Sequence, residues 1–317
     1  MPPISAPGPG GVVLACGLAT LDVVQTVDAV PTANEKVVAS DLLVAVGGPA
    51  ANAAVTCAVL GVASRLLSRI GEGPLAAAMR ADLAAHGVQV LDVAAPGSLP
   101  PVSTVLVTRG SGERAVVSVN ATLATRGDVP DLADDVVVVL VDGHHLDLAL
   151  AVAEQARRRG VPVLLDGGSW KPGLEALLAL VDVAILSADF AIPGGGDALT
   201  DVRAMGPRIV AQSHGGAPIE VLWGPGAARG RTGPIQVPVP PVEVVDTLGA
   251  GDALHGALAA WAAAQEGGVP TDDPDPWLHG LAWAAGVASA SCGAPGARGW
   301  VVDTAAVAEW RRDLAGR

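Results

Sequence analysis

The sequence predicts an α/β fold in which helices cover both faces of a central, mostly parallel β-sheet. Three short apolar runs, at residues 136–141, 161–165 and 183–186, alternate with helical patterns at 148–159 and 174–180. Their apolar character is continuous rather than alternating, which is typical of parallel strands buried on both faces. The intervening helices provide the crossovers that parallel strands require. With 317 residues, 50% of them apolar, the chain is long enough for one large core.

Boundary residues support the elements at the two ends of the chain. Residues 12–16 form a β-branched, apolar run that stops at Gly17, which indicates the first strand. Pro49 in a first turn and Gly61 just past an end are the start and stop signals of the Ala-rich helix between them. The C-terminal third is expected to be helical at residues 251–264, 277–290 and 304–314.

Two segments depart from this pattern, at about residues 33–47 and 101–121. Both are richer in alternating apolar and polar residues, and the second contains a Gly-Ser-Gly turn at 110–112 that is typical of a hairpin. Such strands are half-buried, so we expect them to form a small secondary sheet beside the main one. No long linker or repeat interrupts the chain, and we expect a single domain over residues 1–317.

The balance of charges excludes several classes of partner. Nineteen basic and 32 acidic residues give a formal net charge of −13, so nucleic acids and anionic membranes are not expected ligands. No apolar stretch approaches the length of a membrane-spanning helix. Residues 1–10 lack the basic start of a secretory signal, and three widely spaced cysteines make neither a disulfide framework nor a zinc site. We expect a cytoplasmic protein with reduced thiols.

The segment with the clearest chemistry is Asp-Thr-Leu-Gly-Ala-Gly-Asp at residues 246–252, which leads into a predicted helix. The small residues Gly249, Ala250 and Gly251 allow a ligand to approach backbone N–H groups at the helix N-terminus, where an anion is favoured. Asp252 would place a carboxylate beside that anion. An anion pocket next to a base is what phosphoryl transfer to a hydroxyl needs. The alternative is an ordinary tight turn in which Asp252 only complements the helix dipole.

This segment resembles the Asp-Thr-x-Gly-Ala-Gly-Asp motif of the ribokinase-like (PfkB) carbohydrate kinase family. Further similarities follow in the family's order at residues 17–31, 47–52, 70–88 and 293–299. Together they extend over most of the chain, which makes chance a poor explanation. The resemblance implies a ribokinase-like fold, with a central mostly parallel sheet, helices on both faces and a small β lid.

The resemblance also implies roles for individual residues. Asp252 would be the catalytic base, beside an anion hole made by Gly249, Ala250 and Gly251. The residues implied to bind the acceptor are Asp22, Gly48 and Asn52, together with Arg114, which resembles a family arginine that swings in on the lid to meet phosphate. Those implied on the nucleotide side are Asp246, Thr247, Ser187 and Gly215. Asp22, Asn52 and Arg114 each have a plainer alternative, as a strand-end, helix-start and solvated side chain respectively.

The same resemblance implies ATP and Mg²⁺ as cofactors and a monovalent cation such as K⁺ near Asp246, with no residue assigned to a metal. The implied partners are a small sugar and, through the lid strands, a second copy of the chain in a homodimer. His144 and His145 follow a predicted strand, but no third ligand is spaced nearby, so a loop role is favoured over a metal site. His255 is expected to be a packing residue.

Departures from the family pattern reduce the number of acceptor classes that the resemblance implies. The expected Asn-x-x-Glu is replaced by Ser-Ala-Asp-Phe at 187–190, as in ketohexokinase-like relatives, and similarity is greatest to the ketohexokinase and sulfofructose-kinase branch. A second motif, near the nucleotide, is altered at 212–216. Pro49 and Ala50 stand where relatives that act on sugar phosphates carry a lysine, which implies an unphosphorylated acceptor. No sulfonate-binding arginine is evident near His144, which argues against sulfofructose.

We therefore predict an ATP-dependent kinase for a primary hydroxyl of a ketohexose- or pentose-like sugar. A nucleoside kinase on the same fold is an alternative, although only 3% of residues are aromatic and available to stack on a purine. A non-catalytic sugar-binding or regulatory protein would require loss of the base, and Asp252 is present. Neither a Gly-x-Gly-x-x-Gly after the first strand nor a Gly-x-x-x-x-Gly-Lys occurs, so dinucleotide and P-loop sites are excluded.

Overall fold

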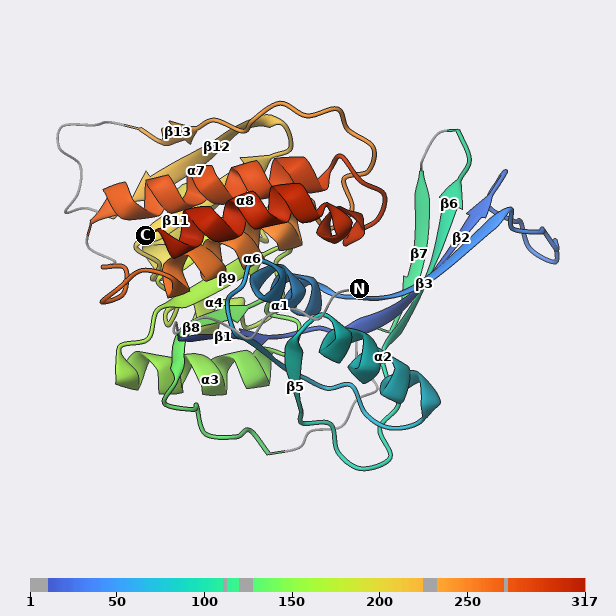
Figure 1. Ribbon diagram of the computed structural model, residues 1–317, viewed down its shortest axis with the longest axis horizontal. Coiled ribbons are helices and arrows are strands. Elements are labelled where there is room, and N and C mark those ends of the chain that lie inside the picture. Colours follow the sequence, from blue (N-terminus) through green and yellow to red (C-terminus); the bar gives the residue numbers. More distant parts are fainter. Residues whose placement is uncertain (1–10, 111–112, 120–127, 225–232, 271–272, 317) are drawn as a thin grey trace.

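Two β-sheets of unequal size form the framework of the protein (Figure 1). The computed structural model describes residues 11–110, 113–119, 128–224, 233–270 and 273–316. Within these residues the large sheet has nine strands and the small sheet four. Three predicted features lie outside the described residues: the N-terminal segment 1–10, residues 111–112 of the predicted turn, and the end of the 101–121 segment.

The large sheet is mostly parallel, as predicted. In spatial order it contains β13 (Ile235–Val237), β12 (Ala217–Trp223), β11 (Ile209–His214), β10 (Val183–Leu186), β9 (Val163–Gly167), β8 (Val136–Val141), β1 (Val12–Cys16), β4 (Ser64–Ser68) and β5 (Val88–Asp92). All strands from β11 through β5 are parallel, and β12 and β13 add an antiparallel edge. Because β1 pairs with both β4 and β8, the order of winding reverses there. Ligands of open α/β sheets bind at the carboxyl ends of strands beside such a point.

Helices cover both faces of this sheet. On one side lie α1 (Pro49–Val59), α2 (Pro74–Ala85), α6 (Ala250–Ala263), α7 (Pro274–Ser291) and α8 (Thr304–Ala315). On the other side lie α3 (Leu146–Arg159), α4 (Leu174–Leu178) and α5 (Ala198–Met205). Val13 and Ala15 of β1 belong to the first core, and Leu14 and Cys16 to the second. Burial on both faces explains why the strands lack an alternating pattern.

Element boundaries differ from the predicted ones by a few residues. The predicted strand 161–165 begins at Val163, because Gly160 closes α3 in the left-handed conformation and the Val161 N–H still bonds back to the Ala156 carbonyl at 3.0 Å. Helix α7 begins at Pro274 rather than at residue 277, because the Asp273 side chain caps it.

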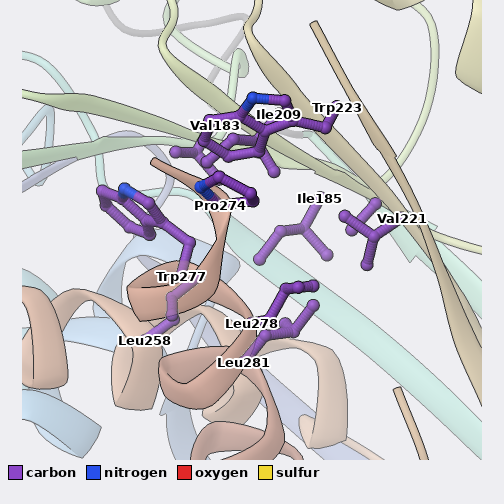
Figure 2. Close-up of a pocket in the computed structure, with 11 residues that line it drawn as sticks. Val183, Ile185, Ile209, Val221, Trp223, Leu258, Pro274, Trp277, Leu278 and Leu281 are labelled. Atoms are coloured by element: carbon purple, nitrogen blue, oxygen red, sulfur yellow. The ribbon is translucent and has the colours of Figure 1, made fainter. Parts of the chain in front are cut away.

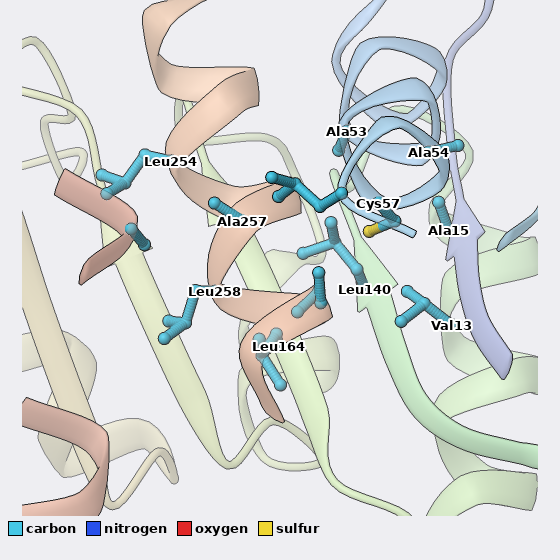
Figure 3. Packing of buried hydrophobic residues seen from close by; sticks show 14 of the residues in the cluster. Val13, Ala15, Ala53, Ala54, Cys57, Leu140, Leu164, Leu254, Ala257 and Leu258 are labelled. Carbon is cyan, nitrogen blue, oxygen red and sulfur yellow. The ribbon is translucent and has the colours of Figure 1, made fainter. Parts of the chain in front are cut away.

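Helices α1 and α6 pack unusually closely, as Figure 3 shows for Ala53, Cys57 and Ala257. A Cβ atom at Gly256 would lie 2.5 Å from the Ala53 carbonyl oxygen, so only glycine permits this approach. The Cys57 thiol also donates to the Gly256 carbonyl at 3.1 Å. The contact brings the N-terminal turns of the two helices together, and these turns carry Asn52 and Asp252.

The small sheet projects from one end of the large sheet (Figure 1). Its order is β3 (Asp41–Gly47), β2 (Thr20–Val27), β6 (Val102–Thr108) and β7 (Arg114–Ser118). The two alternating segments therefore do form a separate sheet, as predicted. One detail of the prediction is wrong, because residues 33–40 contain no strand. Residues 20–27, which the sequence analysis did not include in this sheet, form the strand β2. Strand β2 follows β1 after three residues and pairs with β6 from Leu21 through Val27.

A small gap remains between the sheet and the helices near Trp277 and Leu281 of α7 (Figure 2). Its volume is ≈ 10 Å³ and its lining, from Ile185 and Val221 across to Leu258, is apolar. A cavity of that size holds at most one water, so the gap is a packing defect rather than a ligand site. Among the helices in the described ranges, none is long and apolar enough to span a membrane.

Candidate active site

The N-terminus of α6 contains the residues of the predicted anion hole. Gly249 is the N-cap residue with φ of 75°, and no side chain caps the helix. A Cβ atom at Gly249 would lie 2.5 Å from Ala297 Cβ, so both the backbone conformation and the space demand glycine. Ala250 and Gly251 form the first turn, whose N–H groups and dipole favour an anion. The residues of the predicted anion hole therefore lie together at the start of α6.

Asp252 lies in the same turn and is held by Asn52 of α1. The Asn52 Nδ2–H donates to Asp252 Oδ2 at 2.6 Å. Asp252 stays partly exposed, yet burial raises its pKa, while the Asn52 hydrogen bond and the positive charges of His255 and Arg298 act to lower it. A partly accessible carboxylate with a raised pKa is suited to accept a proton from a bound hydroxyl.

Asp22 faces this region from the small sheet. Burial raises its pKa, and hydrogen bonds from Ser103 and Thr20 and the positive charge of Arg298 oppose the shift. The interaction of Asp22 with Asp252 also raises the pKa of Asp22, so the two carboxylates share one electrostatic environment.

Gly48 adjoins the same region at the start of α1. Its φ is 97°, and a Cβ atom there would lie 2.4 Å from the Leu18 carbonyl oxygen. Glycine is therefore needed for the chain to pass between β3 and α1. The structure thus gathers the predicted acceptor-side residues Asp22, Gly48 and Asn52 around Asp252.

Asp142 is a residue that the sequence analysis did not single out. Its Oδ2 accepts N–H groups of Leu18 at 2.7 Å and Ala50 at 3.3 Å, and its Oδ1 accepts the His144 N–H at 2.9 Å. One carboxylate thereby ties together the loop after β1, the start of α1 and the loop after β8. Its position directly after the predicted strand 136–141 could have indicated a functional role. The sequence analysis assessed only His144 and His145 at that place.

Three histidines lie near the site and contact neighbouring groups of the protein. His255 has Nδ1 at 2.6 Å from the Gly251 carbonyl and 3.4 Å from Asp166 Oδ2, and Nε2 at 3.2 Å from the Ile185 carbonyl. It packs inside the protein, as expected, and it also pairs with Asp166. Burial raises the pKa of Asp166 to about 6, with His255 acting to lower it.

His144 and His145 belong to no metal cluster within the described part of the chain. Burial lowers the pKa of His145 to about 4, and the positive charge of Arg69 adds to that effect. The Arg69 Nη1 lies 3.5 Å from His145 Nδ1. The expected loop role is consistent with this environment.

A cleft of ≈ 480 Å³ lies on the other side of the anion site, between the β11–β12 edge and helices α6 and α7. Four predicted residues line it: Gly215, Thr247, Ala250 and Gly251. Its walls are largely apolar, with Ile219, Val239, Val242, Leu254 and Ala285 among them. The size and apolar lining suit a nucleotide base.

Ser187 does not line this cleft. Its hydroxyl donates to the Gly168 carbonyl at 2.9 Å, just beyond the end of β10. Ser187 is therefore not among the residues that line this cleft, and neither is Asp246.

An ion pair joins the small sheet to the loop before α6. Arg114 Nη2 donates to Asp246 Oδ1 at 2.7 Å, and the Leu248 and Gly296 N–H groups donate to the same carboxylate at 3.0 and 2.9 Å. Burial acts to raise the pKa of Asp246, but these hydrogen bonds hold it below its usual value. Arg114 thus reaches the anion-site loop.

Arg298 is a second residue that the sequence analysis missed. It lies in the loop at 293–299, which was matched to a family motif without any residue being assigned. Its Nε–H donates to Asn52 Oδ1 at 2.8 Å, and an Nη1–H donates to Asp82 Oδ2 at 2.7 Å. The available signal was an arginine, in a chain with few basic residues, within a glycine-rich loop.

Comparison with known proteins identifies the family. The profile of the pfkB family carbohydrate kinases matches residues 12–304. Ribokinase from Bacillus subtilis (strain 168) is 25% identical over 259 residues, which cover 77% of this chain and 83% of the relative.

Solved structures agree in fold. A protein described as a ribokinase from Agrobacterium tumefaciens has 25% identity and a TM-score of 0.77, covering 97% of this chain and 99% of that one. Ribokinase from Arabidopsis thaliana, complexed with ribose and ATP, has 20% identity and a TM-score of 0.71, covering 96% and 99%. Aminoimidazole riboside kinase from Salmonella enterica has 20% identity and a TM-score of 0.71, covering 95% and 99%. The chain therefore belongs to the pfkB family and is an ATP-dependent carbohydrate kinase with the ribokinase-like fold.

Proposed function

We propose that this kinase phosphorylates a primary hydroxyl of an unphosphorylated ketohexose- or pentose-like sugar, with Asp252 as the general base. The observation that carries the proposal is the position of Asp252, in the first turn of α6 beside the Gly249–Gly251 anion site and fixed by Asn52 at 2.6 Å. Asp22, Gly48 and Asn52 would bind the sugar hydroxyls. The absence of a lysine at Pro49 or Ala50 supports an unphosphorylated acceptor.

The chemistry follows from this arrangement. Asp252 takes the proton of the attacking hydroxyl, whose oxygen then attacks the γ-phosphorus of ATP in line with the leaving oxygen of ADP. The N–H groups at the α6 N-terminus stabilise the negative charge on the moving phosphoryl group. Holding the two substrates in line supplies much of the remaining acceleration.

The nucleotide would lie in the cleft lined by Gly215 and Thr247, with Asp246 and Arg114 at its phosphate end. No group of three candidate metal ligands occurs within the described residues, which fits Mg²⁺ held mainly by ATP phosphates and water. Mg²⁺ would neutralise phosphate charge when bound, and the side-chain oxygens of Ser187 and Asp189, which follow β10, would be candidate ligands just outside the cleft. A monovalent cation such as K⁺ would need backbone carbonyls near Asp246, whose carboxylate is engaged by Arg114. Comparing turnover in K⁺ and Na⁺ tests this part.

The small sheet would act as a lid over the acceptor. Leu42 and Val44 of β3 and Val116 and Val117 of β7 are exposed. The exposure of these apolar side chains supports a homodimer in which two lids pair. We place the enzyme in the cytoplasm. Light scattering of the wild type and of Val117→Lys measures that association.

The acceptor class distinguishes the alternatives. The similarity to ketohexokinases favours fructose-like acceptors, whereas the fold is also that of a Salmonella enterica aminoimidazole riboside kinase. An ADP-release screen over ketoses, pentoses and nucleosides, beside a thermal-shift panel, decides between a sugar and a nucleoside kinase. Sugar-induced stabilisation without ATP turnover would favour a non-catalytic binding protein.

The test of the base is Asp252→Asn. We expect a folded protein whose turnover falls at least about 10²-fold, the lower end of general-base effects. Asp135→Asn is the matched control, because this exposed carboxylate pairs with Arg65 away from the site and should leave turnover unchanged. Near wild-type turnover in Asp252→Asn would refute the proposed mechanism.

A further inference from the structure

Arg298 enters the acceptor side of the site from the loop between α7 and α8. Only 13% of its side chain is exposed, although arginine is rarely buried without cause. Two of its nitrogens are bound, Nε to Asn52 and Nη1 to Asp82. Its Nη2 is buried and has no hydrogen-bond partner among the described residues. The guanidinium is therefore held at the site by two contacts, one of which goes to the amide that contacts the base.

The contact with Arg298 decides which way the Asn52 amide points. An asparagine amide has one accepting oxygen and one donating NH₂ group, whereas arginine can only donate. The Asn52 oxygen must therefore face Arg298, which leaves the Nδ2–H directed at Asp252 Oδ2 at 2.6 Å. With the amide flipped, the Asn52 oxygen would face the Asp252 carboxylate, and the Asn52 NH₂ group would face the Arg298 Nε–H, so that an acceptor would meet an acceptor and a donor would meet a donor.

We propose that Arg298 is a positioning residue for the base: it fixes the Asn52 amide so that its N–H group holds Asp252 Oδ2 and leaves Oδ1 for the acceptor hydroxyl. This inference rests on the proposed role of Asp252. The contacts run from Asp82 of α2 through Arg298 and Asn52 to Asp252, and so join the C-terminal loop to the reacting centre.

The charges around Asp252 predict how its titration responds. The titratable groups that interact with it are Asp22, Asp142, His144, Asp166, His255 and Arg298. Burial raises the pKa of Asp252, and the Asn52 hydrogen bond and the charge of Arg298 lower it. Loss of Arg298 removes its positive charge and releases the amide, so both effects raise the pKa of the base.

The experiment measures the pH profile of kcat/KM in Arg298→Met. We expect a fall of roughly 10- to 100-fold, as for loss of a hydrogen bond to a charged group, and an acid limb displaced to higher pH. Arg298→Lys keeps a cationic donor and should show a smaller fall and a smaller displacement. Arg69→Met is the matched control: Arg69 is also buried and paired with a carboxylate, Asp147, but its loss should leave the acid limb in place. Thermal unfolding identifies any variant that fails to fold.

A double-mutant cycle tests whether Arg298 acts through Asn52. In an Asn52→Ala background, Arg298→Met should lower kcat by less than about threefold further, because coupled residues are not additive. A folded Arg298→Met enzyme with an unshifted acid limb, or fully independent losses in the cycle, would overturn the inference. Those results would not affect the proposed role of Asp252 as the base, provided that Asp252→Asn is defective in turnover. An active Asp252→Asn enzyme would instead refute the role of Asp252 itself.

Discussion

Replacing Gly47 by alanine should weaken acceptor binding without unfolding the protein. Gly47 ends β3, and a Cβ atom there would lie 1.9 Å from Asp22 Oδ2. The φ of Gly47 is not positive, so the alanine backbone is allowed and the carboxylate must move instead. Restoring an ordinary contact displaces that carboxylate by roughly 1 Å or more, which is enough to break a hydrogen bond to the sugar.

The energy at stake is that of a hydrogen bond between a carboxylate and a sugar hydroxyl. Such bonds contribute about 1.5–3 kcal/mol, equivalent to roughly 10- to 150-fold in binding. In our proposal Asp22 contacts a part of the sugar that does not react, so the ground state and the transition state lose the same interaction. The expected result is a KM for the acceptor that rises roughly 10- to 100-fold while kcat changes little.

The neighbouring glycine provides the contrast. Gly48→Ala places a Cβ atom 2.4 Å from the Leu18 carbonyl oxygen at φ of 97°, so backbone must shift and stability should fall by about 1–3 kcal/mol. Steady-state kinetics by ADP release and calorimetric Tm values separate the two effects. The reasoning is refuted if Gly47→Ala keeps KM within about twofold of the wild type. It is also refuted if the KM defect persists undiminished in an Asp22→Ala background.

Two further predictions use other contacts. Arg114→Ala should change the free energy of unfolding by less than about 1 kcal/mol, because its ion pair with Asp246 is partly exposed. The same variant should raise the KM for ATP several-fold. Unchanged ATP kinetics would contradict a role of Arg114 at the nucleotide. His145 has its pKa lowered to about 4 by burial, so the unfolded state binds more protons below the ordinary value of about 6.5. Stability should therefore fall from pH 6.5 toward pH 4, and urea unfolding should show that His145→Gln removes on the order of 3 kcal/mol of that loss; an equal loss in both proteins would contradict it.

The large sheet and its helices follow from local sequence, whereas part of the small sheet does not. Runs such as 136–141 are apolar throughout, and Gly160 and Pro49 mark helix ends, so these elements have signals within a few residues. Strand β2 has no comparable signal of its own. It is stabilised by β3 and β6, and β6 lies far along the chain, so its hydrogen bonds exist only after the chain has folded.

The same distinction applies to the site. The anion hole and Asp252 are contiguous in sequence, and a glycine turn at a helix start is a local pattern. Arg298 and Asn52 are 246 residues apart, so no spacing rule connects them. Asp142 likewise acts on N–H groups of Leu18 and Ala50, which belong to other elements. Residues that orient the predicted ones are thus harder to find than the predicted ones themselves.

Several acidic residues of the chain gather around the candidate base. Asp22, Asp142, Asp166 and Asp252 interact at the end of the sheet where our proposal brings a triphosphate. Backbone N–H groups at the α6 N-terminus can bind phosphate without adding a titratable cation near the base. The pKa of Asp252 is then set by few positive charges, chiefly His255 and Arg298, acting against burial and neighbouring carboxylates. In such a site each cation has a large individual effect, so the pH profile of a single-charge variant is a more sensitive reporter of this active site than its stability.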